Sequence, residues 1–329
     1  MHAVETEALR KEYTGGIEAV AGIDLAIEEG EVFGFLGPNG AGKTTTVRML
    51  TTLLRPTSGR ARVVGFDLAR EQHEIRRSIG VALQEAGLDG LATARELLEL
   101  QAKLCGLGVT DSRERASEML ELVGLTDAAE RKVKTFSGGM KRRLDLASAL
   151  VHRPRMLFLD EPTEGLDPAS RHAVWQEVQR LNRQMGMTVF LTTHYMEEAD
   201  RLADRLAIID HGRIVAEGTP TELKASIGAD VVTVALGDAG VEVARSLLSE
   251  IDGLRELRPE ETSLTLFVDN GTQAVAQVVR ILDGAGIAMG QVAVAHPTLD
   301  EVFLRATGSR LEGARSGGEA DDGADGHRR

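Results

Sequence analysis

The chain has 329 residues, of which 42% are hydrophobic and 27% are charged. This length and composition predict a mostly globular chain with one large and one small domain, or two medium ones. The net charge of -13 argues against nonspecific nucleic-acid binding, which depends on neutralising phosphates, so we expect no nucleic-acid partner. The single cysteine, Cys105, excludes a disulfide framework and a cysteine-based metal cluster within one chain, and it favours a reducing compartment.

The chain shows no segment typical of export or membrane insertion. Its first residues, MHAVETEALRKEY, lack the basic flank and apolar core of a secretory signal. No apolar run approaches the roughly 20 residues that a helix needs to cross a bilayer. We therefore expect the chain to form no transmembrane pathway of its own.

The first elements in chain order are a meander, a strand and a helix. Apolar and polar residues alternate over residues 1–30, with Gly breaks, which predicts a short antiparallel meander. The compact apolar run EVFGFL, Glu31–Leu36, predicts a buried strand. After a Gly-rich loop, Thr44–Leu54 is expected to be a helix that stops at Arg55 and Pro56.

The middle of the chain predicts helices and then further strands. Apolar residues recur at helical spacing from about residue 91 to 152, so this segment is expected to be mostly helical. Three short apolar runs follow, at Met156–Leu159, Val189–Thr192 and Leu206–Ile209, with helical segments between them. Apolar strands that alternate with helices predict an α/β fold with a mostly parallel sheet covered on both faces.

A second domain is expected after the composition shift near Ser226–Asp230. The predicted order of strand, helix, two strands, helix and strand is the ferredoxin-like pattern. A short amphipathic helix at Thr298–Thr307 is expected to close this domain and to pack on it. From Gly308 onward almost no large apolar residue occurs, which predicts a disordered tail. The predicted elements are strand 231–236, helix 241–252, strand 254–258, strand 263–268, helix 272–283 and strand 287–294.

A phosphate-binding loop lies between the first predicted strand and helix. It reads GPNGAGKT, which fits G-x-x-x-x-G-K-[ST]. Its glycines let backbone N–H groups point at phosphate oxygens, and the helix N-terminus adds partial positive charge. Lys43 is expected to contact the β- and γ-phosphates, and the Thr44 hydroxyl to ligate Mg²⁺. The loop alone does not distinguish among P-loop nucleotide hydrolases. The residues expected to bind ATP here are Gly37, Pro38, Asn39, Gly40, Ala41, Gly42, Lys43, Thr44 and Thr45.

Two acidic residues end the apolar run MLFLDE. In open α/β sheets, ligands bind at the carboxyl ends of the strands. Asp160 is expected to hold Mg²⁺, directly or through water, and Glu161 to polarise an attacking water as general base. Neighbouring residues on a strand point to opposite sides, so the two acids take different roles.

A further segment makes a family resemblance specific. Phe136–Met140 reads FSGGM and resembles the signature segment of ABC ATPases, usually Leu-Ser-Gly-Gly-Gln, which that family also places shortly before the acidic strand. Ser137 is a good helix N-cap, and Gly138 and Gly139 permit close backbone approach to an anion. Phe136 and Met140 depart from the usual Leu and Gln, which puts the subtype in doubt and leaves the expected phosphate contacts intact.

Other elements follow in the family's order, and the resemblance covers residues 3 to about 224. Gln84 looks like the family's Q-loop glutamine, which implies a place near Mg²⁺ and the attacking water. His194, in LTTHYMEEAD, looks like the switch histidine that senses the γ-phosphate, and Tyr13 resembles the aromatic residue that stacks on adenine. Glu164–Asp167 (EGLD) resembles the D-loop and includes its aspartate. Glu164 stands where a small residue is common, and the sequence gives no mechanistic reason for it.

The resemblance implies a fold and an assembly. In this family, Ser137 and the following glycines of one subunit complete the ATP site of another in a head-to-tail dimer. ATP closes the dimer, and hydrolysis reopens it. The implied fold is an ABC cassette over residues 1–225, with a mostly parallel core sheet, an antiparallel β subdomain and a helical subdomain at about 85–155. A ferredoxin-like accessory domain at 230–307 and a tail at 308–329 follow.

The C-terminal segment His296–Gly308, HPTLDEVFLRATG, is similar to the LDEVFL element of the daunorubicin/doxorubicin-resistance type of ABC ATPase. Such subunits pair with a separate membrane permease, lie on the cytoplasmic face of the membrane, and typically export hydrophobic drugs or other amphiphiles. The alternative is an ABC ATPase with a role in translation or DNA repair. One phosphate loop and the lack of long coiled coils argue against it. A P-loop GTPase or kinase is more remote, because neither has a signature segment before the acidic strand.

Overall fold

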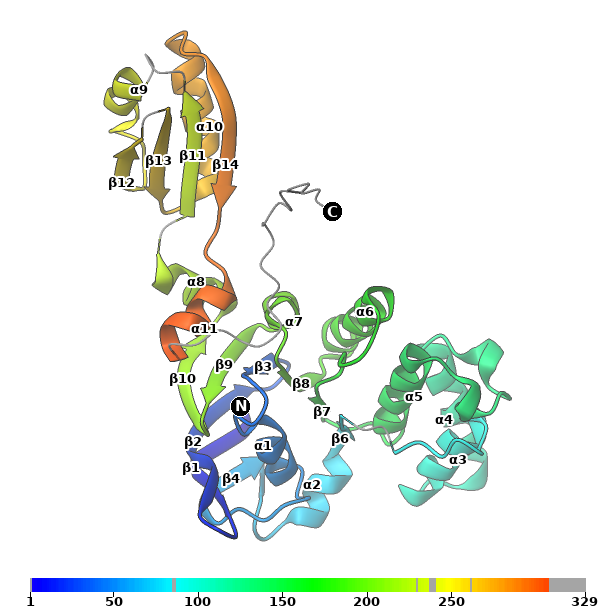
Figure 1. The fold of residues 1–329 in the computed structure, drawn as a ribbon. Helices are drawn as coiled ribbons and strands as arrows, with labels where there is room; N and C mark the ends of the chain where they lie inside the picture. The colour runs from blue at the N-terminus through cyan, green and yellow to red at the C-terminus, as the bar shows by residue number, and fades with distance from the viewer. Residues whose placement is uncertain (1, 85–86, 229, 237–240, 261, 308–329) are drawn as a thin grey trace, which may run out of the picture.

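The computed structural model describes residues 2–84, 87–228, 230–236, 241–260 and 262–307 (Figure 1). The tail predicted from Gly308 onward lies outside the described residues.

A six-stranded sheet forms the centre of the larger part of the molecule. Its strand order is β10-β9-β3-β8-β7-β6, and every neighbouring pair is parallel except β10 with β9. The prediction of a mostly parallel sheet is therefore confirmed. The strands are β3 (Val32–Leu36), β6 (Ile79–Ala82), β7 (Met156–Asp160), β8 (Thr188–Thr193), β9 (Arg205–Asp210) and β10 (Arg213–Gly218).

An antiparallel sheet and helix α1 (Lys43–Leu50) cover one face of this central sheet. The predicted meander is the long pair β1 (His2–Tyr13) and β2 (Ile17–Glu28), joined by β4 (Ser58–Val63) and β5 (Phe66–Asp67). Four phenylalanines fill the layer between, with the Phe190 ring 5.5–6.0 Å from its three neighbours. They are Phe33, Phe35, Phe158 and Phe190, all fully buried.

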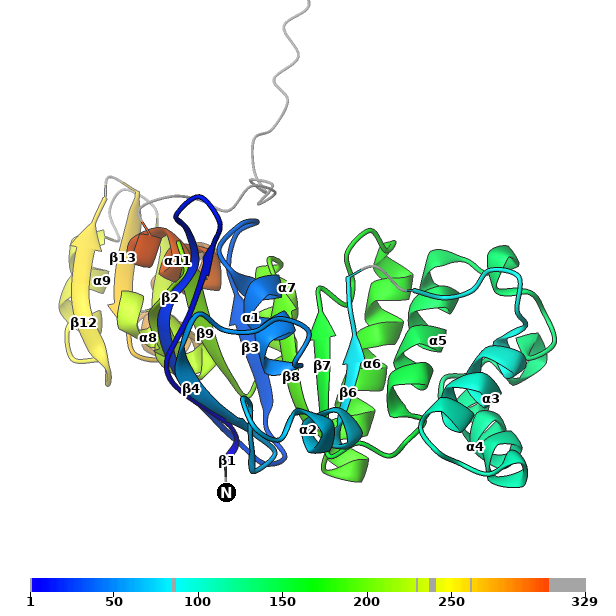
Figure 2. The ribbon, with the colours of Figure 1, turned by 90° about the horizontal axis from the view of Figure 1, so that it is seen from below.

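Helices cover the opposite face (Figure 2). The helical segment predicted from about residue 91 to 152 is confirmed as α3 (Ala94–Leu104), α4 (Val109–Leu122) and α5 (Gly138–Leu150). A capping box of Thr93 and Glu96 begins α3. The remaining helices of this part are α2 (Gln72–Ser78), α6 (Pro168–Met185), α7 (Met196–Leu202) and α8 (Pro220–Ile227). None of the helices among the described residues is both long and apolar enough to cross a membrane.

The C-terminal part has the predicted strand–helix order. Its antiparallel sheet has the strand order β12-β13-β11-β14, as a ferredoxin-like fold requires, with α9 and α10 packed on one face. Asp230, which starts the domain, contacts His296 just after its last strand, with 2.9 Å between Oδ2 and Nδ1. The elements are β11 (Asp230–Leu236), α9 (Val241–Leu248), β12 (Leu254–Pro259), β13 (Ser263–Val268), α10 (Gly271–Gly284) and β14 (Met289–Ala295).

The last helix, α11 (Leu299–Thr307), does not pack where its sequence predicts. Figure 1 shows the chain leaving β14 and returning to lie beside α8. Phe303 is buried in a cluster that includes Leu36, at the end of β3, and Ala199 of α7. Arg305 donates hydrogen bonds to the carbonyls of Ser226 and Ile227 at the end of α8, at 3.2 and 3.1 Å. The expectation that this helix packs on its own domain is wrong, because an apolar stripe does not specify which surface buries it.

Candidate active site

The predicted phosphate loop links β3 to α1 and depends on two glycines. Gly42 has a φ of 108°, and a Cβ there would lie 2.3 Å from the Ala19 carbonyl oxygen. A Cβ on Gly37 would lie 2.3 Å from the Ile209 carbonyl oxygen. Any larger residue would therefore push the loop off the neighbouring strands.

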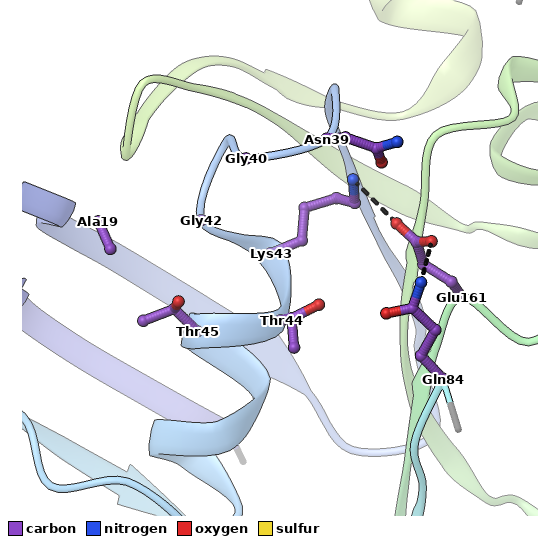
Figure 3. A pocket seen from close by; sticks show the side chains of 9 residues that line it. All are labelled: Ala19, Asn39, Gly40, Gly42, Lys43, Thr44, Thr45, Gln84 and Glu161. Carbon is purple, nitrogen blue, oxygen red and sulfur yellow. Dashed lines mark hydrogen bonds and ion pairs between the residues drawn. The ribbon is translucent and has the colours of Figure 1, made fainter. Parts of the chain in front are cut away.

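The Lys43 side chain points back into its own loop. Its Nζ donates to the carbonyl oxygens of Gly37 at 2.7 Å and Pro38 at 3.0 Å. It also forms an ion pair with Glu161, with 3.1 Å between Nζ and Oε1 (Figure 3). The ammonium is only 4% exposed and has partners for all its donors. Phosphate oxygens that enter the loop would replace these partners and separate Lys43 from Glu161.

Asp160 lies at the carboxyl end of β7 and is 1% exposed. Its Oδ1 accepts hydrogen bonds from Thr192 Oγ1 at 2.6 Å and Thr44 Oγ1 at 3.2 Å. Its Oδ2 is buried without a hydrogen-bond partner. A buried carboxylate oxygen without a donor is costly, and beside a threonine hydroxyl it fits a hard cation such as Mg²⁺.

Glu161 follows at a sharp turn of the backbone, with a φ of 47°. Its amide donates to the Thr192 carbonyl at 3.1 Å and to Thr192 Oγ1 at 3.0 Å, so β8 holds the turn. His194 Nδ1 lies 3.5 Å from Glu161 Oε1. The pKa of Glu161 is lowered to about 2: the interaction with His194 is the largest cause, burial opposes it, and Glu164 and Lys43 lower it further. With His194, Glu164 and Lys43 around it, Glu161 is a weak base in this arrangement.

These side chains surround a pocket of about 300 Å³. Figure 3 shows the side chains of Lys43 and Gln84 pointing toward Glu161, each at a different oxygen of its carboxylate. Tyr13 stands nearby at the end of β1, 38% exposed, with its hydroxyl 3.5 Å from Thr45 Oγ1. The lining residues are Ala19, Asn39, Gly40, Gly42, Lys43, Thr44, Thr45, Gln84 and Glu161.

Not every residue predicted to bind ATP lines the pocket. Gly37 and Pro38 instead hold Lys43 through their carbonyls. Ala41 is buried against the core, and its carbonyl accepts a hydrogen bond from Gly212 N. Ala19, on β2, lines the pocket and carries no sequence signal.

The signature residues lie on a different element. Ser137 is the N-cap of α5, accepting a hydrogen bond from Met140 N at 3.2 Å. A Cβ on Gly139 would lie 2.6 Å from Ser170 Oγ, whereas one on Gly138 would meet only Leu166 at 3.4 Å. Among the described residues, those that line the pocket around Lys43 include none of Ser137, Gly138 and Gly139.

The two departures in this segment are packing residues. Phe136 is buried in the cluster of the helical subdomain, with the Arg131 guanidinium 5.6 Å from its ring, and Met140 packs against the same cluster. Both fill apolar space, so they leave the Ser137 cap unchanged.

Asp167 of the predicted D-loop is the N-cap of α6. Its carboxylate accepts hydrogen bonds from the Ser170 amide at 3.0 Å and the Ser170 hydroxyl at 2.6 Å. These hydrogen bonds, that from the Ser170 side chain above all, lower the pKa of Asp167.

The sequence carries no sign of several residues that do not line the pocket but hydrogen-bond to the site residues or to the segments that carry them. Thr192 orients both acids, as described above. Buried Arg142, on α5, donates to the carbonyls of Leu83 at 2.6 Å, Pro162 at 2.8 Å and Asp160 at 3.2 Å. It thereby ties the signature helix to the segments that carry Gln84 and the acidic pair. Burial raises the pKa of its partner Asp145 to about 6, although Arg142 opposes the shift. An arginine one turn into a helix gives no sequence signal for such carbonyl contacts.

The family comparisons agree with this geometry. Residues 20–164 match the family described as ABC transporter, and residues 218–307 match that described as ATP-binding protein DrrA1-3-like, C-terminal domain. The chain is 45% identical to daunorubicin resistance ATP-binding protein DrrA2 of Streptomyces coeruleorubidus, over 94% of this chain and 97% of the relative. It is 47% identical to daunorubicin/doxorubicin resistance ATP-binding protein DrrA of Streptomyces peucetius, over 93% of this chain and 92% of the relative.

Solved structures give the same result for the fold. A dimeric ATP-binding cassette in a post-hydrolysis state, bound to ADP and phosphate, is 30% identical with a TM-score of 0.61, covering 66% of this chain and 98% of that one. The protein cbiO1 of Clostridium perfringens, part of an ABC transporter complex, is 27% identical with a TM-score of 0.63, covering 76% of this chain and 96% of that one. The chain thus belongs to the ATP-binding subunits of ABC transporters, in the daunorubicin/doxorubicin-resistance group, and is an ATP hydrolase.

Proposed function

We propose that this ATPase powers the export of a hydrophobic drug or another amphiphile through a separate membrane permease, on whose cytoplasmic side it lies. The observation that carries the proposal is the match over nearly the whole chain, C-terminal domain included, to relatives named for daunorubicin and doxorubicin resistance. A relative from Bacillus subtilis, 39% identical over 94% of this chain, is named for linearmycin resistance. These relatives support the transport role over one in translation or DNA repair.

The geometry of the site supports a separate role for each of its residues. Lys43 and the loop amides bind the phosphates, and Tyr13 offers an exposed ring to the adenine. Asp160 and Thr44 would hold Mg²⁺, with Gln84 beside them, and the ion would neutralise charge on the phosphates. Glu161 orients and deprotonates the attacking water, and His194, next to Glu161, contacts the γ-phosphate side of the site.

Two identical subunits are needed to complete each site. Ser137, Gly138 and Gly139 lie at a helix N-terminus suited to an anion, yet the pocket in their own chain does not include them. A head-to-tail pair would bring them to the phosphates held by Lys43 of the other subunit. ATP binds this closed pair better than the open subunits, and that difference in affinity drives the permease.

Exposed apolar side chains support a partner on the helical subdomain. Leu100 and Leu104 lie one turn apart on α3 and are 58% and 73% exposed. Apolar side chains left in water on the subdomain that follows Gln84 suit contact with a permease.

The test is co-expression with candidate permeases and assay of ATPase activity in membrane vesicles. We expect association with one permease and faster ATP hydrolysis when daunorubicin or another amphiphile is added. Co-purification with ribosomes alone, leaving the membranes without ATPase activity, would contradict the proposal.

A further inference from the structure

Glu164 differs from the small residue common at its position, and its side chain makes a specific contact. Its Oε2 accepts a close hydrogen bond from Gln84 Nε2. The same nitrogen lies 3.4 Å from Glu161 Oε2. The carboxylates of Glu161 and Glu164 therefore share the side-chain amide nitrogen of Gln84, and Glu161 is the expected general base.

The backbone places Glu164 on the side of Glu161. The Glu164 amide donates to the Glu161 carbonyl at 3.2 Å, and the Leu166 amide donates to the Thr163 carbonyl at 3.2 Å. These turns, with Gly165 at a φ of 70°, keep the two carboxylates on the same side. Glu164 is exposed and does not line the pocket, and its carboxylate contacts Gln84 and also lies close enough to Glu161 to lower the pKa of that residue.

The shared contact determines how the Gln84 amide is turned. An amide has a nitrogen with two donors and an oxygen that only accepts. With the nitrogen between two carboxylates, the oxygen must face away from them, and Figure 3 shows it turned toward Thr44. The opposite orientation would place the amide oxygen against two negative charges.

We propose that Glu164 is a positioning residue that orients the Gln84 amide so that its oxygen faces the Mg²⁺ side of the site. This inference rests on the proposed role of Gln84 beside Mg²⁺. With a small residue at position 164, only the 3.4 Å contact with Glu161 would hold the amide. Glu164 thus prepares one metal ligand before the nucleotide arrives.

The expected effect is that of one hydrogen bond. Removing Glu164 is expected to weaken metal binding three- to tenfold; a tenfold change equals about 1.4 kcal/mol, which is at the upper end of the roughly 0.5–1.5 kcal/mol that a typical single hydrogen bond contributes. Glu164→Gln is expected to lose less than Glu164→Ala, because a glutamine oxygen still accepts from Gln84.

The experiment titrates Mn²⁺ into the full chain bound to a non-hydrolysable ATP analogue and follows the free ion by electron paramagnetic resonance. The variants are Glu164→Ala, Glu164→Gln, Gln84→Ala and the Glu164/Gln84 double alanine. Glu197→Ala is the matched control, since Glu197 is an exposed carboxylate in the first turn of α7. The Mg²⁺ concentration for half-maximal ATPase rate is expected to rise by the same factor in Glu164→Ala, with kcat at saturating Mg²⁺ within about twofold.

The double variant decides the mechanism. If Glu164 acts through Gln84, its removal has no further effect in the Gln84→Ala background. The proposal would be overturned if removing Glu164 still weakened metal binding in the Gln84→Ala background. It would also be overturned if Glu164→Ala bound the metal with wild-type affinity while Gln84→Ala bound it weakly. Both outcomes would leave the metal role of Gln84 intact. Wild-type affinity in Gln84→Ala would instead remove the premise and the proposed metal role of Gln84.

Discussion

The placement of α11 makes a strong prediction about stability. Phe303 is 1% exposed and packs in the cluster that contains Leu36, directly before the phosphate loop, and Ala199 of α7. Removing a buried phenyl ring costs about 3–5 kcal/mol, since the cavity adds to the lost transfer free energy. Phe303→Ala is therefore expected to lower the unfolding free energy of the ATPase domain by that amount, although the residue follows the C-terminal domain in sequence.

The chain provides its own probe for this test. Trp175 is the single tryptophan and is buried on α6 in the ATPase domain, so its fluorescence during urea unfolding reports that domain alone. Leu304→Ala is the control on the same helix, because Leu304 is 36% exposed and its loss is expected to cost less than about 1 kcal/mol. An unchanged Trp175 midpoint in Phe303→Ala would show that α11 is not part of the ATPase core and refute the reasoning.

Three further variants test the site and its support. Glu161→Gln is expected to keep ATP binding and to lose at least a hundredfold in turnover. Size-exclusion chromatography with ATP should show a trapped dimer of this variant. Unchanged ATP hydrolysis would exclude Glu161 as the general base. Lys43→Ala should lose nucleotide binding in a fluorescence titration, because no other side chain of the loop supplies a positive charge. Burial raises the pKa of Asp145 from 3.8 to about 6, so the folded state prefers the protonated acid and stability falls as the pH rises through this window. The stability of Asp145→Asn relative to the wild type should therefore increase by about 2 kcal/mol between pH 4 and pH 7, and a constant difference in urea unfolding would contradict this.

The elements that sequence predicts correctly are those whose signal is local. A buried strand such as β3 or β7 is a short apolar run, and the phosphate loop and acidic pair follow directly after them. The βαββαβ order likewise fixes the strand order of the C-terminal sheet, because few topologies satisfy it. Tertiary contacts supply the rest. Nothing in the sequence near Thr192 shows that its hydroxyl holds Asp160, or that Arg142 reaches three carbonyls from separate segments.

The return of α11 changes how the two domains are related. The ferredoxin-like sheet begins at Asp230 and the chain leaves it just before His296, and the contact between these two side chains joins its two ends. The flanking helices α8 and α11 both belong to the ATPase fold, where they pack on each other. In topological terms the accessory domain is an insertion into the cassette, and α11 is the last element of the host. The matched C-terminal family accordingly spans this junction, residues 218–307, so α8, the accessory domain and α11 form one sequence unit that packs in two places.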